Sequence, residues 1–389
     1  MNKKLTLSLI AMGALGAITL TACDPGGTGG TDTPPPPPPA TYTIGGNVTG
    51  LQGGGLMLQL NGAESLQVGA SGSFVFTGKV ATGGSYAVSV KTQPSTPPQT
   101  CTVTSGSGTV ASANVTNVAV ACSTNAYKVG GTVMGLAGNI VLQNNQGDDI
   151  TVSADGTFEF PTAVVSGGSY AVTIKTQPDT KICTVTGDTG QVTSGPVTSV
   201  MVTCASPTTC KALKTSNPAA ADGTYAIDPD GSGPLPEVMA FCDMTTDGGG
   251  YTSVAVKTGI STSRFDQPNS CTAMGLKIAI PRTKAHLTAL VNKYTIAYFQ
   301  TVPGVTGTKA GNYTGCAMNS GDNTCGANWK AIDGGAWFAR AVAYSEPNGD
   351  YTPGCWLGSG SIDANGLLFN DAGCSYSTGT NYVCSDNAK

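Results

Sequence analysis

The chain has 389 residues, a formal net charge of -4 and a sequence pI near 5.0. At roughly 150 residues per domain, this length predicts about two or three domains. Only 11% of the residues are charged and 54 are glycine, which disfavours a coiled coil, a charge-rich disordered tail and a basic nucleic-acid-binding protein. Abundant Gly, Thr, Ser and Val favour short strands and turns. The composition therefore predicts a mainly β chain that binds no nucleic acid.

The N-terminus has the features of an export signal over residues 1–22. Asn2-Lys3-Lys4 gives a positive start, and residues 5–20 form an apolar stretch shorter than a membrane span. The following run, Leu20-Thr21-Ala22-Cys23, resembles the signal of bacterial lipoproteins; an ordinary signal peptide with an incidental cysteine is the alternative. The resemblance implies cleavage before Cys23 and acylation of its thiol, with several acyl chains forming a firm membrane anchor. We expect the anchored protein at the outer membrane or cell surface. The inner membrane is the alternative, because Asp24 directly follows Cys23.

Cysteine usage agrees with export. Of the 13 cysteines, twelve remain when Cys23 is set aside, an even number that favours about six disulfides. No Cys-x-x-Cys spacing occurs, so zinc ribbons and thioredoxin-like motifs have no support. Residues 23–40 form a Pro- and Gly-rich linker with six consecutive prolines from Pro34 to Pro39. Such a run favours polyproline II and predicts a semi-rigid spacer.

An internal repeat fills residues 41–206. The segment Gly83 to Val88 recurs as Gly167 to Val172, and both copies alternate apolar and polar residues as half-buried strands do. We expect two antiparallel β-sandwiches, at residues 41–124 and 125–206. They resemble the Ig-like or carboxypeptidase-regulatory-like repeats of bacterial surface proteins, which implies a stalk. Two cysteines lie 21 residues apart in each copy, which predicts these bonds: Cys101 to Cys122 and Cys183 to Cys204.

Residues 207–252 have a different character. The motifs Asp222-Gly223-Thr224-Tyr225, Phe241-Cys242-Asp243 and Asp247-Gly248-Gly249-Gly250-Tyr251 resemble the opening segment of fibrinogen-like domains. In that family the first two cysteines are bonded, which implies a bond between Cys210 and Cys242. Nothing after Thr252 continues the pattern, so the family's ligand sites are not carried over. Three acidic residues could coordinate a cation, although an Asp-Pro-Asp-Gly turn forms without an ion: Asp228, Asp230 and Asp243.

Residues 253–389 carry a different set of motifs. They include Ala279-Ile280-Pro281-Arg282, Glu346-Pro347-Asn348 and Phe369-Asn370-Asp371, and together they resemble a C-type lectin-like domain. The resemblance implies an α+β fold, so we expect a mainly β chain of two sandwiches followed by such a domain. It also implies bonds between Cys271 and Cys384 and between Cys355 and Cys374. Cys316 and Cys325 remain as a local pair.

The lectin-like resemblance implies a Ca2+ site. Calcium prefers six to eight oxygen ligands, such as carboxylates and amide carbonyls. In that family the Glu-Pro-Asn loop is the mannose-type arrangement, in which vicinal sugar hydroxyls displace waters from the ion. Pro353 stands where the family has a further acidic ligand, and Asp350 is the expected substitute. The expected metal ligands are Glu346, Asn348, Asp350, Asn370 and Asp371, and the expected saccharide-binding residues are Glu346, Asn348 and Asn370.

Two other classes of function stay open beside a lipid-anchored, calcium-dependent lectin or adhesin whose partner is a saccharide or glycoconjugate. The first is a structural or protein-binding surface lipoprotein without sugar binding. The second is an enzyme, which we do not expect: a Ser-His-Asp site would need His286, the only histidine, and we expect His286 to cap a helix or to face solvent. Paired carboxylates for glycoside hydrolysis stay compatible with the sequence. The natural glycan and the oligomeric state are left open.

Overall fold

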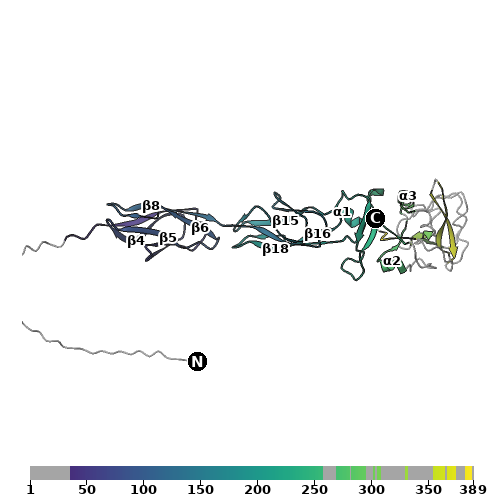
Figure 1. Cartoon of the computed structure of the whole chain (residues 1–389), viewed down its shortest axis with the longest axis horizontal. Coiled ribbons are helices and arrows are strands. Elements are labelled where there is room, and N and C mark those ends of the chain that lie inside the picture. Colours follow the sequence, from purple (N-terminus) through teal and green to yellow (C-terminus); the bar gives the residue numbers. More distant parts are fainter. Residues whose placement is uncertain are drawn as a thin grey trace, which may run out of the picture.

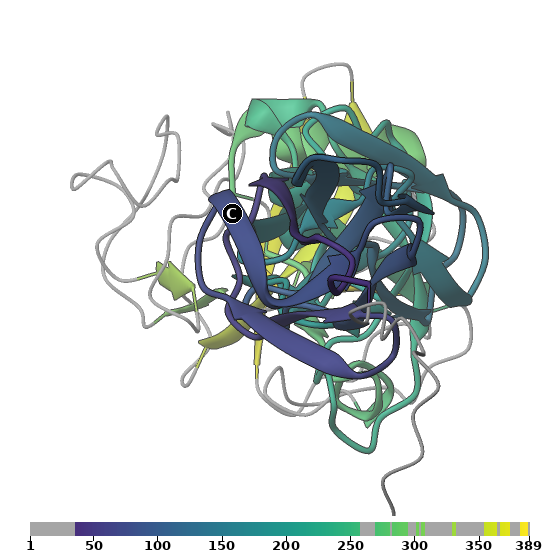
Figure 2. The ribbon, with the colours of Figure 1, turned by 90° about the vertical axis from the view of Figure 1, so that its left-hand side faces the viewer.

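The computed structural model describes residues 36–256, 269–280 and 282–294, and six shorter stretches: 301–302, 305–307, 329–331, 354–363, 366–373 and 382–387. These residues are mainly β, as the composition predicts. Two sandwich units and a C-terminal head follow one another along a single long axis (Figure 1). Seen from the N-terminal end of that axis, unit 1 lies in front of unit 2 and the head (Figure 2).

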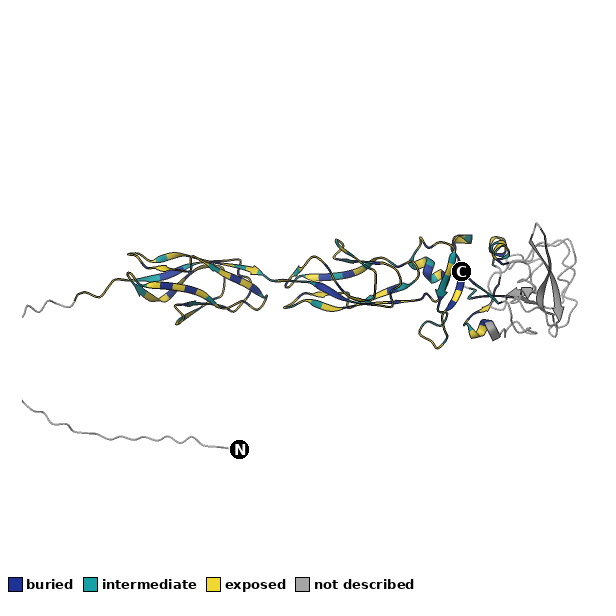
Figure 3. Cartoon of the chain, viewed as in Figure 1, coloured by how far each residue is buried: buried dark blue, intermediate teal, exposed yellow. Residues whose placement is uncertain are grey.

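Unit 1 is a sandwich of two four-stranded sheets, ordered β4-β1-β8-β6 and β3-β2-β5-β7. Alternate residues of its strands point inward, as the dark and light bands of Figure 3 show, so that Ile44, Leu58 and Phe76 are fully buried. Its strands are β1 (Thr41–Thr49), β2 (Leu56–Leu60), β3 (Glu64–Val68), β4 (Gly72–Ala81), β5 (Ser85–Thr92), β6 (Gln99–Thr104), β7 (Ser107–Thr109) and β8 (Val115–Thr124).

Unit 2 repeats this plan with sheets β13-β10-β18-β16 and β12-β11-β15-β17, plus the short pair β14-β9. Phe158 and Phe160 form an edge-to-face pair with ring centroids 5.8 Å apart, and Phe74 and Phe76 do the same at 5.9 Å in unit 1. Its strands are β9 (Ala126–Tyr127), β10 (Val129–Met134), β11 (Ile140–Asn144), β12 (Asp148–Val152), β13 (Gly156–Glu159), β14 (Val164–Val165), β15 (Ser169–Thr176), β16 (Ile182–Thr186), β17 (Thr189–Gln191) and β18 (Val197–Ala205).

Most strand pairs in the units are antiparallel, as expected, but each unit contains one parallel pair. The first and last strands, β1 and β8, run parallel with Gly46 opposite Val118, and β10 and β18 run parallel with Gly131 opposite Val200. Alternating hydrophobicity identifies the inner face of a strand, but it carries no information on the direction of its neighbour. Because the two strands point the same way, the chain enters each unit at one end and leaves it at the other.

The head begins with a five-stranded sheet of order β19-β20-β21-β28-β22 flanked by helices. β28 comes from the C-terminus and pairs with β21, so residues 257–381 start and finish on neighbouring strands. The elements of this sheet and its helices are α1 (Cys210–Ser216), β19 (Gly223–Ile227), β20 (Val238–Asp243), the 3-10 helix η1 (Thr246–Gly248), β21 (Tyr251–Val256), α2 (Asn269–Ala273), β22 (Lys277–Ile278), α3 (Lys284–Lys293) and β28 (Tyr382–Ser385). The inserted strands are β23 (Thr301–Val302), β24 (Val305–Gly307), β25 (Trp329–Ala331), β26 (Gly354–Asp363) and β27 (Gly366–Gly373).

Among the described residues, four disulfides hold these parts together. Two join the cysteines paired by the repeat spacing, and two join cysteines that the family resemblances pair. The two bonds of the units link directly opposed residues of neighbouring strands, β6 with β8 and β16 with β18. In the head, one bond ties α1 to β20 and the other ties α2 to β28. The bonds are Cys101–Cys122, Cys183–Cys204, Cys210–Cys242 and Cys271–Cys384.

In unit 1 the carboxylate of Glu64 joins the edges of the two sheets. It accepts hydrogen bonds from the Thr77 N–H (2.8 Å), the Thr77 hydroxyl (2.6 Å) and the Gly78 N–H (2.9 Å), where β4 is bulged against β1. Asp148 begins the corresponding strand of unit 2 and accepts from the Thr162 N–H at 3.0 Å. The hydrogen bond from the Thr77 hydroxyl is the main cause that lowers the pKa of Glu64 below its ordinary value, against a smaller effect of burial.

We therefore expect Glu64→Gln to destabilise unit 1 at neutral pH by about 1 kcal/mol, a modest loss because water screens the charge. A lowered folded-state pKa contributes stability above the unfolded pKa and loses it as the pH falls through the folded pKa. In the variant, the free energy of unfolding should therefore lack the part of its decrease at low pH that Glu64 causes. Calorimetry across the pH range measures both effects, and Glu159→Gln, on an exposed position of β13, is the matched control. Equal acid dependence in Glu64→Gln and the unsubstituted chain would contradict the role of Glu64.

Candidate functional site

The predicted calcium ligands lie between β21 and β28 in the chain. Asn370 and Asp371 belong to β27, where their register partners on β26 are Gly358 and Leu357. The other three ligands lie outside the described residues, namely Glu346, Asn348 and Asp350. Cys355 lies in β26, whereas Cys23, Cys316, Cys325 and Cys374 also lie outside the described residues, so the two remaining bonds and the lipidation site stay predictions.

The base of the head is closed by the last described residues of the chain. The Thr252 hydroxyl donates to Asp386 Oδ2 at 2.5 Å, and the Ile280 N–H donates to Asn387 Oδ1 at 2.8 Å. Arg282 Nη2 donates to the Asn387 carbonyl at 2.9 Å. Together with the disulfide between α2 and β28, these bonds fix both ends of residues 257–381. Both ends of this segment are therefore joined to the five-stranded sheet.

His286 lies inside this base and not at the surface, so the expectation that it could face solvent is wrong. Its side chain is only 3% exposed and stacks on the Tyr251 ring, with centroids 3.7 Å apart and planes 13° apart. Its Nδ1 accepts a hydrogen bond from the Arg282 N–H at 3.2 Å, and its own N–H donates to Oγ1 of Thr283, the N-cap of α3. The N-cap of α3 is therefore Thr283 and not His286, so His286 does not itself cap the helix. The sequence alone could not reveal that Tyr251 stacks on His286, because the two residues are 35 positions apart in the chain.

The three acidic residues considered for a cation have separate roles. Burial raises the pKa of Asp243, but hydrogen bonds from Thr246 and Thr245 outweigh this effect and leave the pKa below its ordinary value. Asp228 and Asp230 lie together in the turn after β19, and burial and the neighbouring Asp230 carboxyl raise the pKa of Asp228. Among the described residues, no group of three or more His, Cys, Asp or Glu side chains could hold a metal ion.

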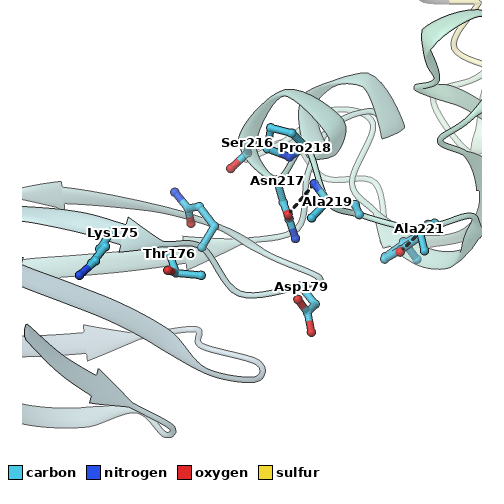
Figure 4. A pocket seen from close by; sticks show the side chains of 11 residues that line it. Lys175, Thr176, Asp179, Ser216, Asn217, Pro218, Ala219 and Ala221 are labelled. Atoms are coloured by element: carbon cyan, nitrogen blue, oxygen red, sulfur yellow. Dashed lines mark hydrogen bonds between the residues drawn. The ribbon is translucent and has the colours of Figure 1, made fainter.

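A cleft with a volume of about 540 Å3 separates unit 2 from the head (Figure 4). One wall is lined by Lys175, Thr176, Gln177 and Asp179 of unit 2, and the other by residues 216–221 with Tyr225. Several polar groups on the walls already have partners: the Tyr225 hydroxyl donates to the Ala221 carbonyl at 2.7 Å, and Asn217 Oδ1 accepts from the Ala219 N–H at 3.2 Å. The sequence signal at this cleft is the Lys-Thr-Gln-Pro motif, which occurs at residues 91–94 and again at residues 175–178. The motif could not reveal a cleft, because the second wall comes from another domain.

No protein-family model matches the chain, and no curated protein matches it. Within the described ranges, none of the helices combines the length and the apolar character needed to cross a bilayer. The fold of the units, the closed base of the head and the residue motifs are the grounds for assigning a function.

Proposed function

We propose that the chain is an exported, lipid-anchored surface protein whose two sandwich units hold a saccharide-binding head away from the membrane. The observation that carries this proposal is the parallel pairing of the first and last strands in each unit. This pairing puts the start of unit 1 and the head at opposite ends of the stalk, as Figure 1 illustrates. A unit with its termini at one end would fold the chain back on itself.

The dimensions support a display role. A strand of ten residues such as β8 spans about 33 Å at roughly 3.3 Å per residue, so two units in line reach about 65 Å. The 18 residues of the Pro-rich linker add about 55 Å if they extend as polyproline II at roughly 3.1 Å per residue. The head would then stand roughly 100 Å or more from the acylated Cys23.

Calcium-dependent binding of a mannose-type saccharide is the activity we assign to the head. It rests on the order of the sequence motifs, on the oxygen ligands that they supply, and on the fixed base from which residues 257–381 arise. Carboxylate oxygens would accept hydrogen bonds from sugar hydroxyls, and amide NH2 groups would donate to them. Pro353, where an acidic ligand is usual, favours a second candidate, a protein-binding head without sugar.

Adhesion of cells carrying the chain to mannan-coated beads tests the proposal. We expect adhesion in calcium, release by chelator or free mannose, and at least tenfold weaker adhesion for Asn348→Asp and for Asp371→Ala. Cys23→Ser should release the protein into the medium without abolishing its calcium-dependent retention on mannose-agarose. Asp179→Asn, on the wall of the cleft in unit 2, is the control that should adhere normally. Equal adhesion by the two ligand variants and the unsubstituted chain would refute the site.

A further inference from the structure

The two repeats differ at one position that faces a junction. Gln99 and Lys181 both stand two residues before the first cysteine of their unit's disulfide. Gln99 is 2% exposed and its amide is used within unit 1: Oε1 accepts from the Gln52 and Gly53 N–H groups, and Nε2 donates to the Gly50 carbonyl at 2.8 Å. In unit 2 the corresponding lysine contacts both its own unit and Glu237 of the head.

Lys181 connects unit 2 to the head through a closed triangle of contacts. Its Nζ donates to the Ser206 hydroxyl at 2.7 Å and lies 3.2 Å from Oε1 of Glu237, which directly precedes β20. The Ser206 hydroxyl donates to the same Glu237 oxygen at 2.6 Å. These hydrogen bonds and the nearby ammonium lower the pKa of Glu237. Of the two ion pairs in the described ranges, the other, Lys175 with Asp149, lies within unit 2.

The chain between the two parts leaves little other freedom. Only residues 206–209 separate β18 from α1, and Ser206 is buried. The carbonyl of Pro207 accepts a hydrogen bond from the Asp228 N–H at 2.9 Å, which draws the linker against the turn after β19. The remaining motion is a hinge about these residues, and the Lys181 contact to Glu237 lies across that hinge.

We propose that Lys181, Ser206 and Glu237 form a latch that fixes the direction of the head relative to unit 2 and thereby the opening of the cleft between them. The Lys181 side chain is 21% exposed and the Glu237 side chain 48% exposed, so water still screens part of this ion pair. It holds better than a pair at an open surface because Ser206 bonds both partners. The latch is independent of what the head binds. Its failure can be distinguished from failure of the lectin assignment, since it is read out as a distance and not as adhesion.

Single-molecule energy transfer within the full chain tests the latch. Keto-bearing amino acids at two exposed positions, Thr151 on β12 and Thr224 on β19, accept the dyes without disturbing the oxidised cysteines. We expect a narrow distance distribution for the unsubstituted chain and one at least twice as wide for Lys181→Met. Lys181→Gln, which places the residue of unit 1 at this position, should widen it equally. Salt at 1 M should widen the first distribution and leave the variants unchanged.

Two further variants decide the outcome. Lys175→Met removes the other ion pair at the rim of the same cleft, and it should leave the distribution narrow. The charge reversal, Lys181→Glu with Glu237→Lys, should restore a narrow distribution that Glu237→Lys alone loses. The latch is wrong if Lys181→Met, confirmed as folded by circular dichroism, keeps the width of the unsubstituted chain, or if the reversed pair stays as wide as the single variant.

Discussion

Replacing Cys271 and Cys384 together with serine should lower the unfolding free energy of the head by about 4 to 5 kcal/mol. The bond joins residues 113 positions apart, and closing so long a loop removes much of the chain entropy of the unfolded state. Both sulfurs are fully buried in the core at the base of the head, where a serine hydroxyl would lack water. Tryptophan fluorescence in denaturant measures the loss, because all three tryptophans, Trp329, Trp337 and Trp356, belong to the head.

The matched control is the double serine variant of Cys101 and Cys122. That bond spans 21 positions, so the same argument predicts a loss of about 3 kcal/mol. The loss should fall on unit 1 and leave the tryptophan transition of the head in place. If the denaturant midpoint of the head did not move in the Cys271 and Cys384 variant, the closure of residues 257–381 by this bond would be wrong.

Gly46→Ala should destabilise unit 1 by about 3 kcal/mol or more. A Cβ on Gly46 would lie 1.7 Å from the Val118 carbonyl oxygen, and that oxygen is backbone in β8 and cannot rotate away. The strand would have to move, which costs at least as much as overpacking a core. Gly131 in unit 2 has the same position, with its Cβ 1.8 Å from the Val200 oxygen, so Gly131→Ala should weaken unit 2 alike. Calorimetry of the full chain resolves the change as an earlier transition.

Gly69→Ala is the control for these two variants. Its added Cβ would meet nothing within 4 Å, so the transition of unit 1 should stay within about 0.5 kcal/mol of the unsubstituted chain. If Gly46→Ala behaved like Gly69→Ala, the close approach of β1 to β8 would not exist. The parallel pairing, and with it the direction of the stalk, would then need another explanation.

Much of the fold of the units could be predicted from sequence because their information is local. Alternation around Tyr86 and Val88 identifies a strand with one buried face, and both residues are buried. The equal spacing of cysteines in the two repeats gives the bond pairs, since opposed residues in neighbouring strands bring sulfurs together. The direction of β8 relative to β1 is different in kind. The direction depends on which strand of the sheet the last strand pairs with, and the residues of β1 and β8 alone do not reveal this.

The same distinction between local patterns and contacts of distant residues applies to the candidate site. The motifs around Asn348 and Asp371 are short runs of residues that can be recognised in the sequence alone. Two of the expected metal ligands, Asn370 and Asp371, lie on β27. The burial of His286 depends on Tyr251, and the contact of Lys181 with Glu237 depends on how two domains meet. For the contact of Lys181 with Glu237, the signal in the sequence is that Lys181 replaces the glutamine found at Gln99 in an otherwise similar repeat. A residue that differs between two repeats can be interpreted only when the domain that packs against each repeat is known.

The parallel terminal strands also determine how the stalk would respond to tension between its anchor and a target held by the head. Pulling the two ends of unit 1 slides β1 along β8, so the hydrogen bonds between them share the load and must yield together. An antiparallel pair pulled from its adjacent ends would open one bond at a time. Once unit 1 gives way, the Cys101–Cys122 bond still withholds about 20 residues from extension, roughly 70 Å of chain. Each unit would therefore release less than its full chain length under force.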